Sequence, residues 1–268
     1  MKMVKIISIN GEVAKEIQLP EVFNEEFRPD LIQRAFLAKK SSKYQPKGVD
    51  PEAGFRTTAE YVGRRGGGRV TICRGISRLP RIKIGKYGWG EVRRVPQARK
   101  GHAAHAPTSE KILKENINKK ENKKAIRSAI AATANKEIVL KRYKSIKNLN
   151  LELPIIIENS LEDLKKAKDL EKIFEKLGLT PLLERSRKRK IVGGKAKMRG
   201  RKYKEKKGAL IVVSKKCDAL KTARNLPGVD VCLAKDLNCV LLAPGGHPGR
   251  ITIYTEGALD EIERVFGA

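Results

Sequence analysis

The hydrophobic and polar positions of this 268-residue chain follow regular patterns near both ends and lose them in a long stretch between. Residues 4–9 and 12–17 flank Asn10-Gly11, a pair that supplies the positive φ angles of a two-residue type I′ turn, so they predict a β-hairpin. A helix is predicted after Pro20, with Pro29 in its first turn and apolar residues at helical spacing as far as Phe36.

Regular patterns resume at residue 109. Residues 109–135 predict a helix whose apolar stripe comprises Ile112, Ile126, Ala129 and Ile130. Short apolar runs at 154–158, 209–213, 229–233 and 250–254 then predict strands buried on both faces. Helical patterns separate these runs, the first of them starting at Ser160 and Asp163, which resemble a capping box, and ending at Gly178.

The alternation of strands and helices implies parallel strands joined by helices, in which helical layers cover both faces of a sheet. The sequence therefore predicts an α/β fold: a three-layer α/β/α domain with a mainly parallel sheet and a very long extended internal loop. We expect residues 1–42 to start the globular domain with the hairpin and helix, and residues 107–268 to complete it. Residues 43–106 form the inserted loop, and a second loop lies at 185–207.

The predicted inserted loop has no sustained period of 2 or 3.6 residues and is dense in glycine, proline and arginine. Apolar residues nevertheless interrupt the charges, among them Tyr61, Ile76, Ile84 and Trp89. That is more apolar than a solvated tail and favours a functional segment that orders on a partner.

Charge identifies the kind of partner. The chain has 59 Lys and Arg against 30 Asp and Glu, a formal net charge of +29, and such self-repulsion becomes tolerable when a polyanion supplies the counter-charge. Nucleic acid is the commonest one. An anionic membrane is disfavoured because no apolar run approaches the roughly 20 residues of a spanning helix. The N-terminus alternates instead of forming a signal-peptide core, so we expect a cytoplasmic protein.

The signatures of enzymes and metal sites are incomplete. Gly63 to Gly68 has the glycine spacing of a phosphate-binding loop but lacks the following Lys and Ser/Thr, and the glycine-rich 245–250 leads into a strand, not a helix. His102 and His105 have no Cys or acidic ligand nearby. The four cysteines show neither a disulfide framework nor metal spacing. We predict no enzymatic activity, no cofactor, no metal and no small-molecule substrate.

Cysteines 217, 232 and 239 lie among apolar residues and are expected to act as small buried hydrophobes, whereas the role of Cys73 is open. Two other function classes stay open. An RNA-processing enzyme with a basic substrate groove would need a pocket with paired carboxylates or an activated histidine. A DNA-compacting protein would bind duplex DNA and structured RNA alike. The apolar-interleaved loop disfavours both, because neither function needs a deeply threaded segment.

Two basic stretches are the candidate RNA-binding sites. Arginine suits phosphate because its planar guanidinium donates bidentately, glycine lets two backbones approach, and aromatic rings stack on exposed bases. The predicted RNA-binding residues of the first stretch and its surroundings are Lys43, Arg56, Arg64, Arg65, Arg69, Arg74, Arg78, Arg81, Lys83, Lys86, Trp89, Arg93, Arg94, Arg99, Lys100, His102 and His105. Those of the second are Arg187, Lys188, Arg189, Lys190, Lys195, Lys197, Arg199, Arg201 and Lys202.

Several motifs, in this order along the chain, resemble the archaeal and eukaryotic form of the large ribosomal subunit protein four family. They are Leu-Pro-Glu-Val-Phe at 19–23, Arg-Pro-Asp-Leu-Ile at 28–32, Gly-Arg-Arg-Gly-Gly-Gly at 63–68, Ser-Arg-Leu-Pro-Arg at 77–81, Arg-Lys-Gly-His-Ala-Ala-His at 99–105, Ala-Arg-Asn-Leu-Pro-Gly-Val at 223–229 and Gly-Gly-His-Pro-Gly-Arg at 245–250. The resemblance covers essentially the whole chain and points to an archaeal-type translation apparatus.

The resemblance implies a structural role in the large ribosomal subunit, with large-subunit ribosomal RNA and neighbouring large-subunit ribosomal proteins as partners. In this family the globular domain sits on the outer face of the subunit, and the internal loop enters the RNA and helps line the nascent-peptide exit tunnel. If this arrangement of the family is carried over to this chain, the loop tip lies near residues 63–74 and Trp89 lies in the returning arm. The tip residues expected at the tunnel are Gly63, Arg64, Arg65, Gly66, Gly67, Gly68 and Arg69.

Overall fold

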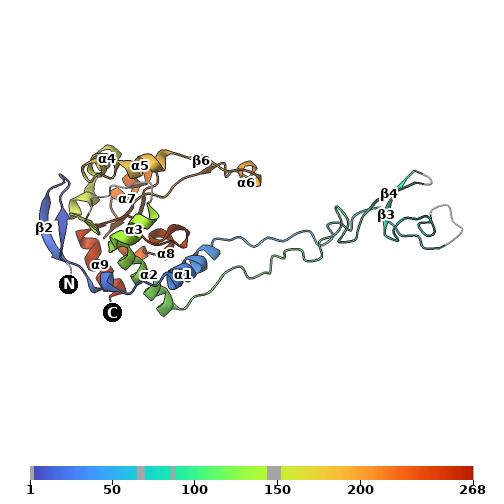
Figure 1. Cartoon of the computed structure of the whole chain (residues 1–268), viewed down its shortest axis with the longest axis horizontal. Helices are drawn as coiled ribbons and strands as arrows, with labels where there is room; N and C mark the ends of the chain where they lie inside the picture. The colour runs from blue at the N-terminus through green and yellow to red at the C-terminus, as the bar shows by residue number, and fades with distance from the viewer. Residues whose placement is uncertain (1–2, 65–69, 86–87, 144–151, 268) are drawn as a thin grey trace. The chain divides into compact units, whose positions relative to one another are not determined.

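The chain folds into two units, seen in a computed structural model that describes residues 3–64, 70–85, 88–143 and 152–267 (Figure 1). Unit 1 consists of Met1–Lys43 and Lys114–Ala268, and unit 2 is Tyr44–Leu113. None of the helices in the described part of the chain has the length and hydropathy required to span a bilayer.

Unit 1 is built on a six-stranded sheet. Its strands, in spatial order, are β2 (Val13–Gln18), β1 (Met3–Ile7), β5 (Ile155–Ile157), β10 (Thr252–Thr255), β8 (Leu210–Val213) and β9 (Asp230–Leu233). Strands β1 and β2 pair antiparallel, while every other neighbouring pair is parallel. The predicted mainly parallel sheet is confirmed.

Helical layers cover both faces of this sheet, which confirms the three-layer α/β/α prediction. One face packs against the 3₁₀ helix η1 (Glu21–Asn24), α1 (Pro29–Ser41), α2 (Lys119–Ala134), α8 (Cys239–Leu242) and α9 (Glu256–Phe266). The other packs against α3 (Lys136–Arg142), α4 (Ala167–Lys176), α5 (Thr180–Arg187) and η3 (Ala223–Asn225). The remaining short helices of the domain are η2 (Asn159–Asp163), α7 (Ala219–Thr222), η4 (Ala234–Asp236) and η5 (Pro244–Gly246).

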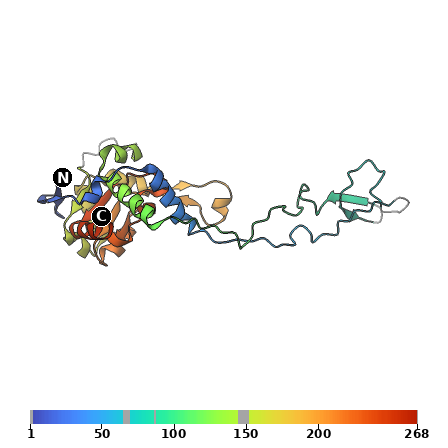
Figure 2. The ribbon, with the colours of Figure 1, turned by 90° about the horizontal axis from the view of Figure 1, so that it is seen from below.

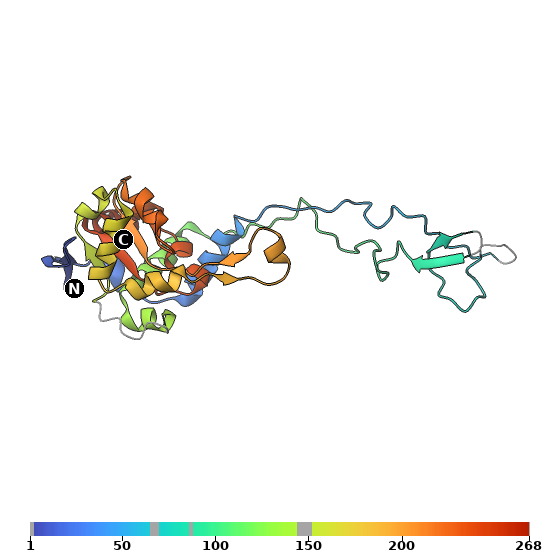
Figure 3. The same cartoon turned by 90° about the horizontal axis from the view of Figure 1, so that it is seen from above.

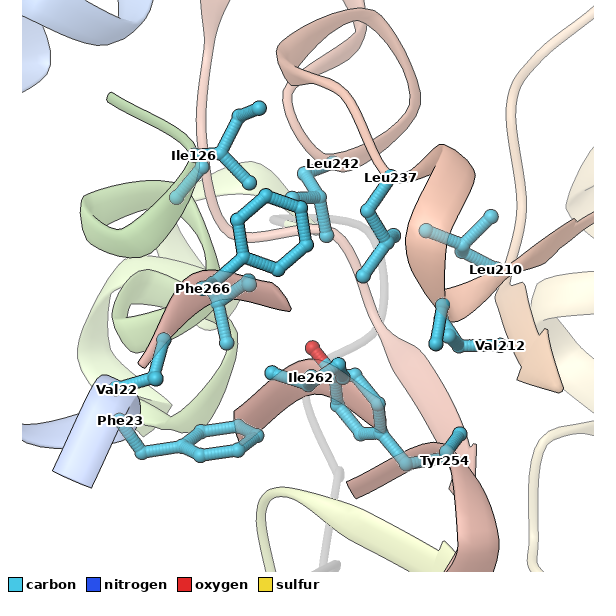
Figure 4. Close-up of a cluster of buried hydrophobic side chains, with 14 of the residues drawn as sticks. Val22, Phe23, Ile126, Leu210, Val212, Leu237, Leu242, Tyr254, Ile262 and Phe266 are labelled. Atoms are coloured by element: carbon cyan, nitrogen blue, oxygen red, sulfur yellow. The ribbon is translucent and has the colours of Figure 1, made fainter. Parts of the chain in front are cut away.

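The strands are buried on both faces because successive side chains point to opposite sides of a sheet. In β8, Leu210 and Val212 join the first hydrophobic cluster, while Ile211 and Val213 join the second. Figure 4 shows the first cluster, where Tyr254 of β10 faces Phe23 of η1 edge to face, with ring centroids 5.5 Å apart. Each fully buried apolar side chain of this kind stabilises the fold by about 1.5–3 kcal/mol.

Two predictions about the N-terminal hairpin and the helix at 109–135 were wrong in detail. The hairpin exists, but only Gly11 of the Asn-Gly pair has a positive φ (88°), and its N–H donates to the Ser8 carbonyl at 3.0 Å. This is a three-residue loop ending in a left-handed glycine, not a type I′ turn. The helix begins only at Lys119, because Ile112 is 88% exposed and has no core to pack against.

The predicted capping box at Ser160 and Asp163 is also wrong. Both residues belong to η2, and α4 begins later, at Ala167. Glu162 accounts for the difference, because its buried carboxylate accepts hydrogen bonds from the Ser214 backbone N–H (2.7 Å) and the Thr255 hydroxyl (2.8 Å). These bonds hold the segment as a tight turn at the carboxyl ends of β8 and β10.

A short basic hairpin extends from unit 1, coloured orange in Figures 2 and 3. It consists of β6 (Lys190–Ile191), α6 (Lys195–Met198) and β7 (Tyr203–Lys204), with β6 and β7 antiparallel. The loop predicted at 185–207 therefore contains regular structure. Each residue of β6 and β7 is exposed to solvent.

Unit 2 contains little regular structure. Its strands are β3 (Arg81–Ile84) and β4 (Gly88–Val92), which form an antiparallel pair. Among its described residues only Ala59 and Thr71 are buried. Unit 2 therefore has no hydrophobic core of its own in the described part of the chain.

Candidate nucleic-acid interface

Unit 2 combines positive charge with uncovered apolar side chains. It has fifteen Lys and Arg against five Asp and Glu. Its exposed large apolar residues are Tyr44, Val49, Phe55, Tyr61, Ile76, Ile84 and Ile112. A segment without a core that displays both cations and apolar groups resembles one that folds against a partner.

The outgoing and returning arms of unit 2 touch at a few defined places. The Val49 N–H donates to the Pro107 carbonyl at 3.2 Å. Further along, Gly54 has a φ of 88°, and a Cβ at this position would lie 2.5 Å from the His102 backbone nitrogen. The rings of Phe55 and His102 stack with centroids 4.6 Å apart. The glycine is required here, because any side chain would push the arms apart.

The hairpin of β3 and β4 is held by polar contacts of its basic side chains. Arg81 donates to the Ser77 hydroxyl at 2.6 Å, Lys83 pairs with Glu60 at 2.5 Å, and Arg93 pairs with Glu91 at 2.7 Å.

Three buried nitrogens of this hairpin lack a hydrogen-bond partner: Arg81 Nε, Trp89 Nε1 and Arg93 Nε. A buried polar group left unpaired costs about 1–3 kcal/mol. The hairpin therefore has three N–H donors that form no hydrogen bond within the described part of the chain.

The structure places the predicted RNA-binding residues in three groups. The exposed ones are Lys43, Arg56, Arg64, Arg74, Arg78, Arg94, Arg99, Lys100, His105, Arg187, Lys188, Arg189, Lys190, Lys195, Lys197, Arg199, Arg201 and Lys202. The partly buried ones are Arg81, Lys83, Trp89, Arg93 and His102. Outside the described residues lie Arg65, Arg69 and Lys86, as do Gly66, Gly67 and Gly68 of the predicted tunnel tip.

Some of these cations already have acidic partners within the chain. Arg56 pairs with Asp50 at 2.7 Å and with Glu52 at 3.1 Å. His102 is occupied as well, since its Nδ1 contacts the Arg94 carbonyl in addition to the ring stack. In contrast, five exposed arginines form no ion pair with the residues that the structure describes: Arg64, Arg74, Arg78, Arg94 and Arg99. These five are the arginines of unit 2 best placed to meet an external anion.

The basic hairpin of unit 1 shows the same mixture of charge and exposed apolar surface. Tyr203 has two cations over its ring, Arg189 at 6.0 Å and Lys202 at 5.3 Å. Met198 of α6 is 79% exposed, and Ile191 of β6 is 56% exposed. The residues 185–207 include thirteen Lys and Arg and a single acid, Glu205, which pairs with Arg189 at 3.0 Å.

Sequence reasoning missed the role of Arg250, the last residue of the 245–250 motif. Its side chain is fully buried and pairs with Asp230 at 2.7 Å. Its guanidinium also donates to the carbonyls of Gly208 and Ala209, both at 2.9 Å. Arg250 thereby joins β8, β9 and β10 where the basic hairpin re-enters the sheet. The sequence did contain one signal for this role, because an arginine stands at the first position of the predicted apolar run 250–254.

Sequence reasoning also missed a pocket whose basic side chains come from distant segments. Lys141, Arg142, Arg185 and His247 line this pocket of unit 1 together with Phe27. Of these, only Arg185 and His247 lay in stretches that the sequence singled out. No motif joins these residues, because the fold alone brings α3, α5 and the 244–250 loop together.

Comparison with known proteins identifies the family. The model of the Ribosomal protein L4/L1 family matches residues 17–265. The large ribosomal subunit protein uL4 of Methanocaldococcus jannaschii is 51% identical over 262 residues, which covers 97% of this chain and 98% of that protein. The protein of the same name from Archaeoglobus fulgidus is 45% identical, with 96% of each chain covered. That from Methanosphaera stadtmanae is 43% identical, with 99% of this chain and 98% of the other covered.

The chain therefore belongs to the Ribosomal protein L4/L1 family. This membership confirms the resemblance seen in the sequence, including its archaeal type, since the three relatives are archaeal. It also confirms the prediction of a ribosomal protein in place of an enzyme, and it gives no support to the RNA-processing alternative.

Proposed function

We propose that this chain is a structural constituent of the large ribosomal subunit in the cytoplasm, where it binds large-subunit ribosomal RNA and supports assembly of the particle. The globular domain anchors the chain, and the inserted loop at 43–106 carries the cations that let RNA helices approach one another. Neighbouring large-subunit proteins are its further partners.

The observation that carries the proposal is the composition of unit 2. Among its described residues, two are buried, while seven large apolar side chains are exposed beside fifteen Lys and Arg in the whole unit. Such a segment gains too little from its own packing to offset the entropy of ordering about 70 residues. Folded RNA offers phosphates to the arginines and unstacked bases to the aromatic rings. The unpaired nitrogens of Arg81, Trp89 and Arg93 fit this reading.

We further propose that the tip of the loop, near residues 63–74, helps line the nascent-peptide exit tunnel. The support is the family resemblance together with the exposure of Arg64, Arg74 and Cys73. Residues 65–69 of this tip lie outside the described part of the chain. We also propose that the predicted RNA-binding residues of both basic stretches contact ribosomal RNA.

Sedimentation of cell lysate through a gradient at moderate salt tests the ribosomal role. We expect the chain to migrate with the large subunit and to leave it only under conditions that strip core proteins. A chain that stayed at the top of the gradient would contradict the proposal. A variant lacking residues 44–113 should fold as unit 1 yet migrate with the particle poorly, because it lacks most of the RNA contacts.

A further inference from the structure

A cationic pocket lies wholly within unit 1, away from the residues predicted to bind RNA. It has a volume of about 500 Å³ and is bounded by α3, α5 and the 244–250 loop. Its charged lining consists of Lys141, Arg142 and Arg185, His247 adds an imidazole, and no Asp or Glu of the described residues lines it. The volume falls in the usual range for small-molecule sites, about 300–1,000 Å³.

The pocket is rigid on the side of the glycine-rich loop. Arg142, at the end of α3, donates to the Pro244 carbonyl at 3.1 Å and to the His247 carbonyl. Gly249 has a φ of 87°, and a Cβ there would lie 2.7 Å from the Ile138 carbonyl oxygen. Only glycine allows this approach, so the loop is fixed against α3 by its backbone.

Arg142 and Arg185, which are partly buried, differ from the buried Arg250 in the counter-charge that the chain supplies. Arg250 is fully buried and has Asp230 at 2.7 Å to balance its charge. Arg142 and Arg185 form no ion pair with any described residue, and Arg185 lies over the Tyr143 ring at 5.1 Å with its Nη1 buried and unpaired. Burial lowers the pKa of Arg142 and outweighs the opposing effect of Tyr143, while the charges of Arg250 and Arg185 lower this pKa further. Arg142 and Arg185 are partly buried and none of the described residues balances their charge, so an external anion would be stabilised beside them.

The wall of the pocket adds an aromatic face to this charge. Phe27 lines it with its side chain 40% exposed, and its ring stacks on no other ring among the described residues. A free phosphate would use the cations but not this ring. A nucleotide uses both, because a base stacks on an aromatic face while its phosphate meets arginine and lysine.

We propose that the cationic pocket holds one nucleotide of large-subunit ribosomal RNA, with its phosphate on Arg185 and Lys141 and its base against Phe27. This inference rests on the proposed ribosomal function and deepens it. It gives the globular unit a built RNA site of its own, separate from the inserted loop and the basic hairpin. An acidic segment of a neighbouring protein is the competing occupant.

The test measures binding of the full chain to deproteinised large-subunit ribosomal RNA on filters. We expect Arg185→Ala to weaken binding by roughly tenfold, the size of effect seen when a hydrogen bond to a charged group is lost. Phe27→Leu should weaken binding by about fivefold or more through lost stacking. The matched control is Lys168→Ala, an exposed lysine of α4 that does not line the pocket and should change binding less than about twofold.

The results of these binding measurements distinguish failure of the pocket proposal from failure of the proposed ribosomal function. If wild-type chain binds the RNA and both Arg185→Ala and Lys141→Ala bind equally well, the pocket proposal is wrong while the ribosomal function stands. If wild-type chain itself does not bind, the proposed function fails. Should Arg185→Ala unfold, Lys141→Ala decides, because Lys141 is exposed at the end of α3.

Ultraviolet cross-linking of intact large subunits identifies the occupant. A nucleotide adduct on the peptide that contains Phe27 supports the proposal. A cross-link from that peptide to another ribosomal protein, with no nucleotide adduct, would overturn it in favour of the acidic segment.

Discussion

The rings of Phe55 and His102 stack at a centroid distance of 4.6 Å and an interplanar angle of 19°, and so join the two arms of unit 2. This contact changes the interpretation of His102, which the sequence marked as an RNA ligand. Its ring is occupied by Phe55 on one face, and its Nδ1 contacts the Arg94 carbonyl. We infer that the main role of His102 is to stabilise the loop, and that it contacts RNA only with the part of its side chain that stays exposed.

Replacing His102 with alanine should loosen unit 2 and leave unit 1 unchanged. An aromatic pair contributes about 0.5–1.5 kcal/mol, so we expect amide exchange around residue 55 to quicken by roughly threefold to tenfold. Hydrogen-exchange mass spectrometry of the chain assembled in large ribosomal subunits measures this. His105→Ala is the control, because His105 is exposed and makes no ring stack among the described residues. Equal exchange in the two variants would show that the stack does not join the arms.

Arg250→Met should destabilise unit 1 strongly. The variant leaves Asp230 partly buried without its arginine partner and removes one hydrogen-bond donor from each of the carbonyls of Gly208 and Ala209. Loss of one member of a buried pair costs about 3–5 kcal/mol. Denaturant unfolding measures the change. Arg264→Met, which removes an exposed 3.5 Å pair with Glu261, should leave the unfolding curve nearly unchanged. Similar losses in both variants would contradict the role assigned to Arg250.

The same pair predicts how stability depends on pH. Burial raises the pKa of Asp230, but attraction to Arg250 and hydrogen bonds from Lys207 and Arg250 outweigh it, so the pKa lies below its usual value. A carboxylate with a depressed pKa contributes stability above its unfolded pKa of about 4 and loses it as pH falls through the folded value. Wild type should therefore exceed Asp230→Asn in stability by a constant margin above about pH 5, and the margin should shrink below about pH 4. Thermal unfolding from pH 7 to pH 3 tests this, and a margin that stayed constant to pH 3 would contradict it.

The strands of unit 1 could be predicted from sequence because runs such as 209–213 are apolar at every position, which suits a sheet covered on both faces. The helix start at Lys119 could not, since Ile112 carries the right spacing but has nothing to pack against. Tertiary contacts, not local pattern, decide such boundaries.

The sequence likewise singled out the basic stretches, most of whose described cations are exposed, but it could not show which arginines lack an acidic partner. The pocket of Arg142 and Arg185 depends on segments that only the fold unites. The buried role of Arg250 depends on carbonyls 41 and 42 residues away.

The basic hairpin of unit 1 should contribute to RNA affinity mainly through charge. Arg199→Ala combined with Arg201→Ala removes two exposed cations, so the slope of log affinity against log salt should fall by about 1.4 to 1.8. Filter binding at several salt concentrations measures the slope. Lys165→Ala with Lys166→Ala is the matched control, because both lysines are exposed on another part of unit 1. If the control changed the slope as much, the hairpin would have no special role.

The cysteines allow the tunnel position to be tested without engineering a reactive group into the loop. Cys73 is exposed, whereas burial raises the pKa of Cys232 and of Cys239 to about 12, which keeps those thiols unreactive. Burial also raises the pKa of Cys217. Ribosomes stalled with a single cysteine in the nascent chain should therefore form a disulfide with Cys73 under mild oxidation.

The cross-link should appear only for nascent positions within a narrow range of distances from the site of peptide synthesis, because a disulfide requires the two Cα atoms to lie within about 7 Å. Gel mobility reports the product, and Cys73→Ser must abolish it while Cys217→Ser leaves it intact. A product that persisted in Cys73→Ser would arise from another thiol. If no nascent position gave a product, Cys73 would not face the tunnel, and the proposed tip near residues 63–74 would have to lie elsewhere in the RNA.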